Sequence, residues 1–382
     1  MRKRTCLAAG GSLLAATISL FGAASASASP QSPVVGHTYV NDNTATANTI
    51  AAFDRHADGS LTPIPGSPFN IGGAGLGVGL GSQGAIQASR NGKFLLAVDA
   101  GSNQISVVHL AANGVPELVG QPVSSGGVEP VSIAISRYGL VYVANVGAGG
   151  SNYTGFRLHS NGTLAPLRGS TISVPEGSGV GDVLFNATGN RLVGTRDNTA
   201  LIDSFAVLRD GRLLAAQGSP FPGQGLGQIG AEFRPTRPWQ LFVTNAHNGT
   251  GLGTVSAFRD NYLGQLHPIG SSPYPDGQTA PCWVEITHDG RYLFAVNTAS
   301  ANISRYSINP NGSLILLGST PFSNGAGSFD ARLSPDGSTL SVTGNGTHVV
   351  SVFAVNGGNL TELPSSPTPL PAGSAPTGIV VL

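Results

Sequence analysis

A short turn that recurs along most of the 382-residue chain constrains its fold more than any other feature. Each copy follows an alternating apolar segment, and Asn-Gly or Asp-Gly in such a position is a strong β-hairpin signal. The clearest copies are Asp58-Gly59-Ser60-Leu61, Asn161-Gly162-Thr163-Leu164, Asp210-Gly211-Arg212-Leu213 and Asn311-Gly312-Ser313-Leu314. The turn glycines, spaced by 46 to 55 residues, are Gly59, Gly114, Gly162, Gly211, Gly264, Gly312 and Gly358.

A second turn lies between successive copies of the first, and a strand follows each copy. Its copies are Asn91-Gly92, Tyr138-Gly139, Thr188-Gly189, Arg237-Pro238, Asp289-Gly290 and Asp336-Gly337. The seventh copy is missing where the chain begins and ends. Residues 378–382 read as a strand with no continuation, and residues 39–41 read as a second strand with no first. Pairing these two segments completes a seventh unit and removes the open edges.

Seven units of four strands predict an all-β protein folded as a seven-bladed β-propeller, with one blade closed by strands from both termini. The alternative is a pair of β-sandwiches, which requires no regular period. The 55 glycines and 26 prolines, beside 40% hydrophobic residues, favour a turn-dense chain with a core over a helical bundle. A formal net charge of zero gives no electrostatic reason to expect binding to nucleic acid or an anionic membrane.

The N-terminal residues predict a secretory signal peptide. Three basic residues at positions 2–4 precede an apolar stretch at 7–24, and Ala-x-Ala patterns end at Ala26 and Ala28. We therefore expect a signal peptide over 1–28, a propeller over 29–382 and an extracytoplasmic or secreted protein. An uncleaved membrane anchor is the alternative. The mature chain then keeps one cysteine, Cys282, which cannot form an internal disulfide and is expected to be a buried, inert thiol.

The strand ends of the repeats resemble a known family. The segments Leu140-Val141-Tyr142-Val143-Ala144-Asn145, Leu241-Phe242-Val243-Thr244-Asn245 and Leu293-Phe294-Ala295-Val296-Asn297 are similar to the YVTN-type propeller repeat. With the turns described above and loops such as Gly218-Ser219-Pro220-Phe221, residues 35–382 resemble the seven-bladed lactonase family. That family includes a bacterial 6-phosphogluconolactonase and carboxymuconate-lactonizing enzymes. The resemblance implies a lactonase or a lactonizing cyclase, but the family's funnel histidines are not matched on the innermost strands of this chain.

The innermost strand of each blade lines the central channel, and its side chains alternate between two faces. Counting back from the second turn, one face is mostly apolar and is expected to pack between blades. The other face presents Gln87, Ser132, Asp182, Glu232, Trp283, Glu285, Asp330 and Arg332. Glu232 reaches this face only if its repeat has one extra turn residue. The alignment therefore predicts four acids and one arginine at one end of the channel, and a slip by one residue would exchange the faces.

These residue types can act on a lactone. Glu232 and Glu285 are the candidate acid and base, because neighbouring carboxyl groups separate into a proton donor and an acceptor. Arg332 is the candidate clamp for a substrate carboxylate. Gln87, Asp182 and Asp330 are candidate ligand-binding groups, and Trp283 is a candidate stacking wall. Alternatively, the acids pair with Arg332 around ordered water, and Trp283 fills a gap in the packing.

The sequence thus predicts an exported protein that hydrolyses or forms a small sugar-acid or muconate-type lactone in its funnel. The alternative is a non-catalytic binding or interaction scaffold, which would expose an apolar or aromatic patch on one face. We expect a monomer that needs no cofactor, with a divalent cation in the funnel as the open alternative. No spacing typical of a zinc site occurs. The run Gly72–Gly84 contains a G-x-G-x-x-G pattern but no following helix, so it is interpreted as a linker or flap.

Overall fold

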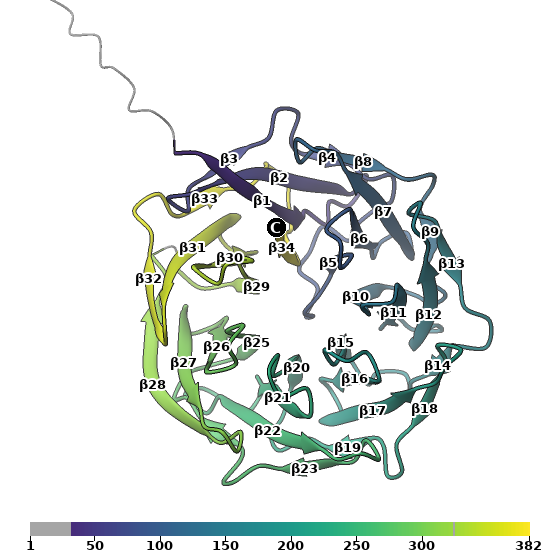
Figure 1. Cartoon of the computed structure of the whole chain (residues 1–382), viewed down its shortest axis with the longest axis vertical. Coiled ribbons are helices and arrows are strands. Elements are labelled where there is room, and N and C mark those ends of the chain that lie inside the picture. The colour runs from purple at the N-terminus through teal and green to yellow at the C-terminus, as the bar shows by residue number, and fades with distance from the viewer. Residues whose placement is uncertain (1–31, 324) are drawn as a thin grey trace, which may run out of the picture. The chain divides into compact units, whose positions relative to one another are not determined.

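The computed structural model describes residues 32–323 and 325–382, so the predicted signal peptide lies outside the described residues. Residues Pro33–Leu382 form one unit. Its strands build seven antiparallel sheets arranged as a ring (Figure 1), which confirms the seven-bladed β-propeller. In this part of the chain, no helix has the length and apolar character needed to cross a membrane.

Each sheet has four main strands, ordered from the channel outward. The innermost strands are β5 (Ile86–Ala88), β10 (Pro130–Ile135), β15 (Val180–Phe185), β20 (Gln228–Phe233), β25 (Pro281–Ile286), β29 (Ser328–Leu333) and β34 (Ile379–Val381). The second strands are β1 (Val34–Asn41), β6 (Phe94–Asp99), β11 (Leu140–Asn145), β16 (Arg191–Arg196), β21 (Gln240–Asn245), β26 (Tyr292–Asn297) and β30 (Thr339–Gly344).

The outer strands complete the blades. The third strands are β2 (Thr49–His56), β7 (Gln104–Leu110), β12 (Asn152–Leu158), β17 (Leu201–Val207), β22 (Thr254–Asp260), β27 (Asn302–Ile308) and β31 (Val349–Asn356). The fourth strands are β3 (Leu61–Pro63), β8 (Pro116–Leu118), β13 (Leu164–Pro166), β18 (Leu213–Ala215), β23 (Leu266–Pro268), β28 (Leu314–Pro321) and β32 (Asn359–Glu362). Short segments also pair with the third strands: β4 (Phe69–Asn70), β9 (Val123–Ser124), β14 (Ile172–Ser173), β19 (Phe221–Pro222), β24 (Tyr274–Pro275) and β33 (Thr368–Pro369).

The two ends of the described chain meet in one blade, as the split repeat predicts. Strand β34 pairs antiparallel with β1, with Thr38 opposite Val381 and Val40 opposite Ile379. The neighbouring pair is tied twice, because His37 N donates to Leu382 O at 2.9 Å and Leu382 N donates to His37 O at 2.8 Å. The C-terminal strand is therefore the innermost strand of the first blade.

The asparagine that ends several second strands has a structural role. Asn41 is fully buried, and its Nδ2 donates to Val98 O of the next blade at 3.0 Å. In β21, Nδ2 of Asn245 donates to both Thr254 and Ser256 on β22, at 2.8 Å each. A buried amide at this position therefore ties a strand end to its neighbours, and such bonds are costly to lose. The repeated motif reports on blade architecture and not on chemistry.

Candidate active site in the central channel

A β-bulge at the start of the longer innermost strands sets which side chains face the channel. The register shifts between Val180 and Asp182 in β15 and between Pro281 and Trp283 in β25, and comparable shifts occur in β10, β20 and β29. A bulge adds one residue and turns the following side chains relative to the sheet. Beyond the bulge, the apolar face packs between blades as predicted, and Ile133, Val183 and Val284 are at most 1% exposed.

Four residues of the predicted polar face lie at one height in the channel. Gln87, Glu232, Glu285 and Arg332 each lie opposite the third residue of the second strand in their own blade. Glu232 pairs with Phe242, ten residues later, whereas Glu285 pairs with Phe294, nine residues later. The extra turn residue is therefore present in the blade of Glu232, and the alignment of the innermost strands is confirmed.

Four carboxyl groups interact electrostatically with the guanidinium of Arg332. Its Nη1 donates to Oε2 of Glu285 at 3.2 Å, and the backbone N–H of Leu333 donates to Oε1 of the same carboxylate at 3.3 Å. Glu232, Asp182 and Asp330 also interact electrostatically with this guanidinium, and each is held in the channel without a close ion pair of its own among the described residues. The cluster as a whole carries more potential negative than positive charge.

The two aspartates lie deeper and are fixed by hydrogen bonds. Asp182 accepts from Oγ of Ser132 at 3.0 Å and from the N–H of Ala231 at 3.1 Å. Asp330 accepts from the N–H of Gly84 at 3.1 Å and is fully buried. Because three neighbouring strands or loops bond to these carboxyl groups, the aspartates hold the blades together around the channel.

Burial keeps protons on this cluster near neutral pH. Loss of hydration raises the pKa of Asp182 to about 8, partly offset by its hydrogen bonds from Ala231 and Ser132. Loss of hydration also raises the pKa of Glu285 to about 7, although Arg332 lowers it. The pKa of Glu232 lies well above its usual value, because burial and then the charge of Glu285 both oppose its ionisation. Neighbouring acids with separated pKa values are suited to acid–base work.

A loop closes the channel next to the cluster. The segment Ser82–Gly84 bonds to four innermost strands: Gln83 N donates to Gly181 O at 3.0 Å, and the N–H of Ile133 donates to Gly84 O at 2.9 Å. The side-chain amide of Gln83 both donates to and accepts from the backbone of Val284, at 3.1 and 3.2 Å. The glycine-rich run was expected to be a linker or an external flap. Its end instead forms a plug, because glycines allow backbone to approach the channel wall closely.

The plug and part of the cluster line a cavity of about 170 Å³, whose wall includes neither Glu285 nor Asp330. Gln83, Gln87, Asp182, Glu232 and Arg332 contribute polar groups to its wall. Trp283 does not, which differs from the expected stacking wall. Its ring is 2% exposed, lies 4.7 Å from the ring of Phe329, and donates from Nε1 to Ser82 O at 2.8 Å. The indole therefore supports the plug and has no face open to a ligand.

Other reactive side chains lie away from the cavity. None of the described innermost strands carries a histidine, as the alignment predicted. Cys282 is buried, and loss of hydration raises the pKa of its thiol to about 12, so thiolate is scarce. In the described part of the chain, no group of three or more His, Cys, Asp or Glu side chains is placed to hold a metal ion.

Comparisons with known proteins agree with this architecture. Residues 238–380 match the model of the family described as lactonase, 7-bladed β-propeller. No curated protein sequence matches the chain. A candidate 6-phosphogluconolactonase from Bacteroides uniformis is similar in structure, with a TM-score of 0.72, 19% identity, and coverage of 90% of this chain and 98% of that chain.

Two further structures support the same conclusion about the fold. A candidate 6-phosphogluconolactonase from Bacteroides fragilis has a TM-score of 0.70 at 20% identity and covers 90% of this chain and 97% of its own. The periplasmic gluconolactonase of Pseudomonas aeruginosa has a TM-score of 0.71 at 15% identity and covers 90% and 98%. With its seven closed blades, the chain is a seven-bladed β-propeller, and its residues 238–380 are similar to the lactonase family of such propellers.

Proposed function

We propose that this protein hydrolyses a small, uncharged sugar lactone in the channel cavity. The observation that carries the proposal is that Glu232 and Arg332 line one cavity of about 170 Å³, while Glu285, next to its wall, accepts a hydrogen bond from Arg332 at 3.2 Å. That volume is below the roughly 300 Å³ at which sites for drug-sized ligands begin, so it suits a single ring. The similarity to the gluconolactonase of Pseudomonas aeruginosa supports the same reaction class.

The charge balance favours a neutral substrate. Arg332 was expected to clamp a substrate carboxylate, but its guanidinium already pairs with Glu285 and faces three further carboxyl groups. A phosphorylated or carboxylated lactone would bring more negative charge into a cavity whose single described cation is already compensated. Like charges in a poorly hydrated site repel strongly. A neutral hydroxylated ring can instead hydrogen-bond to the carboxyl groups and to the amide of Gln87.

The two glutamates differ in a way that assigns their roles. Glu285 is held by Arg332 and ionises near pH 7, so it is the proposed base that takes a proton from water. The water oxygen then forms a bond to the lactone carbonyl carbon. Glu232, whose pKa is raised well above its usual value by burial and by the charge of Glu285, is the proposed acid that protonates the ring oxygen as the carbonyl carbon–oxygen bond of the ring breaks. The product is the open hydroxy acid, which loses a proton to solvent at neutral pH.

The test is proton release at constant pH with glucono-δ-lactone, its 6-phosphate and a carboxylated muconolactone. We expect turnover above the spontaneous rate, and a higher kcat/KM for the neutral lactone. Glu285→Gln and Glu232→Gln should each lower kcat by about 10² to 10⁴, the usual contribution of a positioned acid or base. Glu117→Gln is the matched control, because the Glu117 side chain is 64% exposed on β8.

The possible outcomes distinguish whether the protein hydrolyses lactones from whether it does so in this cavity. Turnover that survives both glutamine variants would keep the reaction and reject this cavity. A preference for the phosphorylated lactone would reject the charge argument. No turnover of any of the three lactones would leave the non-catalytic scaffold as the better description.

Export is a second part of the proposal. The basic, apolar and Ala-x-Ala pattern of residues 1–28 supports it, and so does the periplasmic location stated for the Pseudomonas aeruginosa protein. N-terminal sequencing of the protein recovered from outside the cytoplasm should give a new terminus near residue 27 or 29.

A further inference from the structure

One blade departs from the internal repeat in both of its turns. Where other blades place a small or polar residue before the glycine of the outer turn, such as Asn161 or Asp210, this blade has Tyr262 and Leu263. In its inner turn, Trp239 follows Arg237-Pro238 in place of the usual glycine turn. These large side chains are not buried: Trp239 is 45% exposed and Tyr262 is 86% exposed.

The two departures line the same groove. It has a volume of about 270 Å³ and lies between the blade of β15–β18 and the blade of β20–β23. Trp239, Pro238 and Tyr262 come from the second blade, and Asn186, Thr188 and Asn190 come from the first. Exposed aromatic rings next to polar groups are typical of ligand sites, because they supply large contact area with little loss of conformational freedom.

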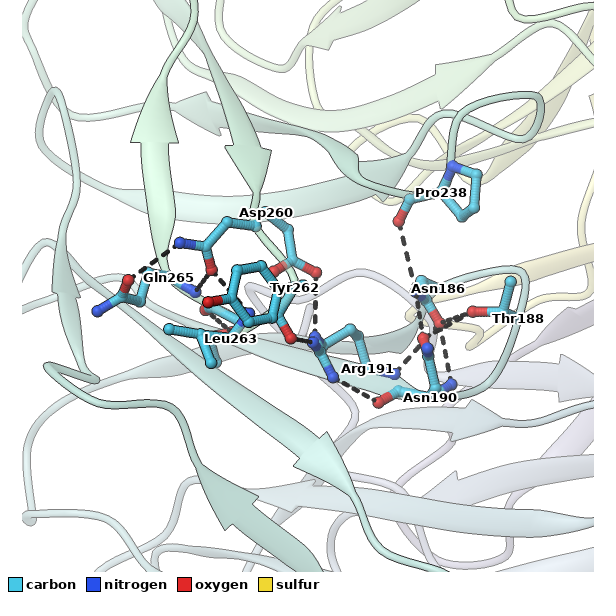
Figure 2. Close-up of polar contacts among 12 residues, drawn as sticks. Asn186, Thr188, Asn190, Arg191, Pro238, Asp260, Tyr262, Leu263 and Gln265 are labelled. Carbon is cyan, nitrogen blue, oxygen red and sulfur yellow. Dashed lines mark hydrogen bonds and ion pairs between the residues drawn. The ribbon is translucent and has the colours of Figure 1, made fainter.

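Arg191 joins the two sides of the groove (Figure 2). Its Nη1 donates to the carbonyl of Asn190 at 3.2 Å, its Nη2 donates to the carbonyl of Tyr262, and its Nε lies 3.3 Å from Oδ2 of Asp260. Asn186 spans the inter-blade gap as well, because its Nδ2 donates to Asn190 Oδ1 at 2.9 Å and to Pro238 O at 3.4 Å. The polar floor of the groove is therefore held in place before any ligand arrives.

One acceptor in this floor lacks a donor. Asp260 is 7% exposed, and among the described residues no hydrogen bond reaches its Oδ1. A buried acceptor left unsatisfied destabilises a protein unless water or a ligand provides the donor. Asp260 is one of the residues that line the groove, although this Oδ1 atom is itself enclosed by protein.

The charges of the groove select the class of ligand. The carboxylate of Asp260 would repel an anionic ligand, and the guanidinium of Arg191 would repel a cationic one. The two side chains already form an ion pair, so neither is free to bind a charged ligand. Most of the remaining polar side chains that line the groove are amides and hydroxyls, which both donate and accept: Asn186, Asn190, Asn261, Thr188 and Tyr262. A neutral ligand with many hydroxyl groups and one apolar ring face matches this mixture. We propose that the groove formed by Trp239, Tyr262, Asn190 and Asp260 is a saccharide-binding site, separate from the lactone cavity.

The experiment uses the two tryptophans of the chain as built-in probes. Trp283 is 2% exposed and Trp239 is 45% exposed, so a quencher in solution reports on Trp239. The full-length protein is titrated with hexasaccharides of β-1,4-linked glucose, β-1,4-linked N-acetylglucosamine and α-1,4-linked glucose. At least one should shift the Trp239 emission and protect it from acrylamide. Tyr262→Ala should weaken that binding about tenfold, as expected when a central aromatic contact is lost.

Tyr138→Ala is the matched control. Tyr138 is 64% exposed in the inner turn of another blade, at a different inter-blade hollow. Trp239→Ala is measured by calorimetry, because it removes the probe, and circular dichroism shows that all variants are folded. No binding of any hexasaccharide, or equal weakening by Tyr138→Ala, would overturn the proposal. Lactone turnover is measured on the same variants, so failure at this groove is distinguishable from failure in the channel.

Discussion

The charge of Arg332 controls the ionisation of the carboxyl groups around it. Four carboxyl groups interact with this guanidinium, so the cluster is stable near neutral pH only because some of its acids stay protonated. Removing a buried cation leaves buried negative charge uncompensated, which destabilises a protein by about 3–5 kcal/mol. The same arrangement leaves little positive potential for an anionic ligand.

The first prediction at this scale concerns Asp182 and pH. Its pKa is about 8 in the folded protein, whereas an aspartate in the unfolded chain titrates near 3.9. Between these values the folded state binds more protons than the unfolded state, so stability falls as pH rises from about 4 to 8. Asp182→Asn should flatten this slope, because asparagine does not titrate. The variant should still fold, since its amide oxygen can accept from Ala231 N–H and its amide nitrogen can donate to Ser132 Oγ.

Urea unfolding at pH 5, 6, 7 and 8 checks this prediction. The wild-type protein should lose more free energy of unfolding across the series than the variant, by on the order of 1 kcal/mol or more. Parallel curves for the two proteins would show that Asp182 is ionised in the folded state.

A second prediction concerns Arg332 itself. Arg332→Met removes the charge while keeping much of the length, so the free energy of unfolding at pH 8 should fall by about 3–5 kcal/mol. At pH 5 the loss should be smaller, since protonation of the neighbouring acids removes the charges that the guanidinium balances. Thermal unfolding at the two pH values measures the difference, and an equal loss at both would contradict this account.

For single residues, the sequence predicts where a side chain lies better than it predicts what that side chain does. The period-two alternation places Glu232, Glu285 and Arg332 on one face, since each innermost strand obeys the same register. It does not reveal that Trp283 turns its indole toward Ser82, because the plug that accepts this bond comes from another blade. Contacts between blades that are distant along the chain leave no local pattern in the sequence.

At the scale of structural elements, the plug has the largest effect on the shape of the channel. Ser82–Gly84 bonds to strands in four blades, so it limits the depth to which a ligand can enter. Composition alone favours a flexible linker for a run this rich in glycine. The positions of the glycines instead allow close backbone approach, which becomes apparent only when the innermost strands are in place.

The prediction for this element is a contrast between two glycines. A Cβ at Gly230 would lie 2.6 Å from the backbone oxygen of Cys282 and would also contact the side-chain oxygen of Gln83. Gly230→Ala should therefore displace the plug and destabilise the protein by about 1–3 kcal/mol. A Cβ at Gly81 meets nothing within 4 Å, so Gly81→Ala is the control and should leave stability unchanged.

Chemical denaturation measures both variants, and in a Trp239→Phe background acrylamide quenching of Trp283 reports on the plug directly. Greater quenching in Gly230→Ala than in Gly81→Ala is expected. If the two variants are alike in both measurements, the plug does not depend on the close approach at Gly230.

For the whole molecule, the repeat period is sufficient to predict the blade number and the closing pair of strands. The turns at Gly162 and Gly211 are local signals, and the missing copy locates the joint between β34 and β1. The groove at Trp239 and Tyr262 is visible in the sequence only as two departures from the repeat. Their convergence depends on how neighbouring blades face each other, which no single repeat encodes.

The closing joint gives the prediction at this scale. Thr38 and Val381 are opposite each other, next to the doubly bonded pair of His37 and Leu382. Such a non-hydrogen-bonded pair has Cα atoms about 4.5 Å apart, within the range of disulfides. In a Cys6→Ser background, Thr38→Cys with Val381→Cys should raise the melting temperature when oxidised, by an amount equivalent to about 2–4 kcal/mol. The reduced protein is its own control, and equal melting temperatures would show that the joint does not open first.

The position of β34 also affects how the ring assembles. Its residues are almost fully buried and pair with β1 across the whole length of the propeller, whereas each other blade is built from consecutive strands. The first blade therefore stays incomplete until this long-range pair forms, however many other blades have already formed. Until then the edge of β1 and the apolar wall beside it are open to chaperones and proteases. Pairing of β34 with β1 is thus the step that protects the folded ring.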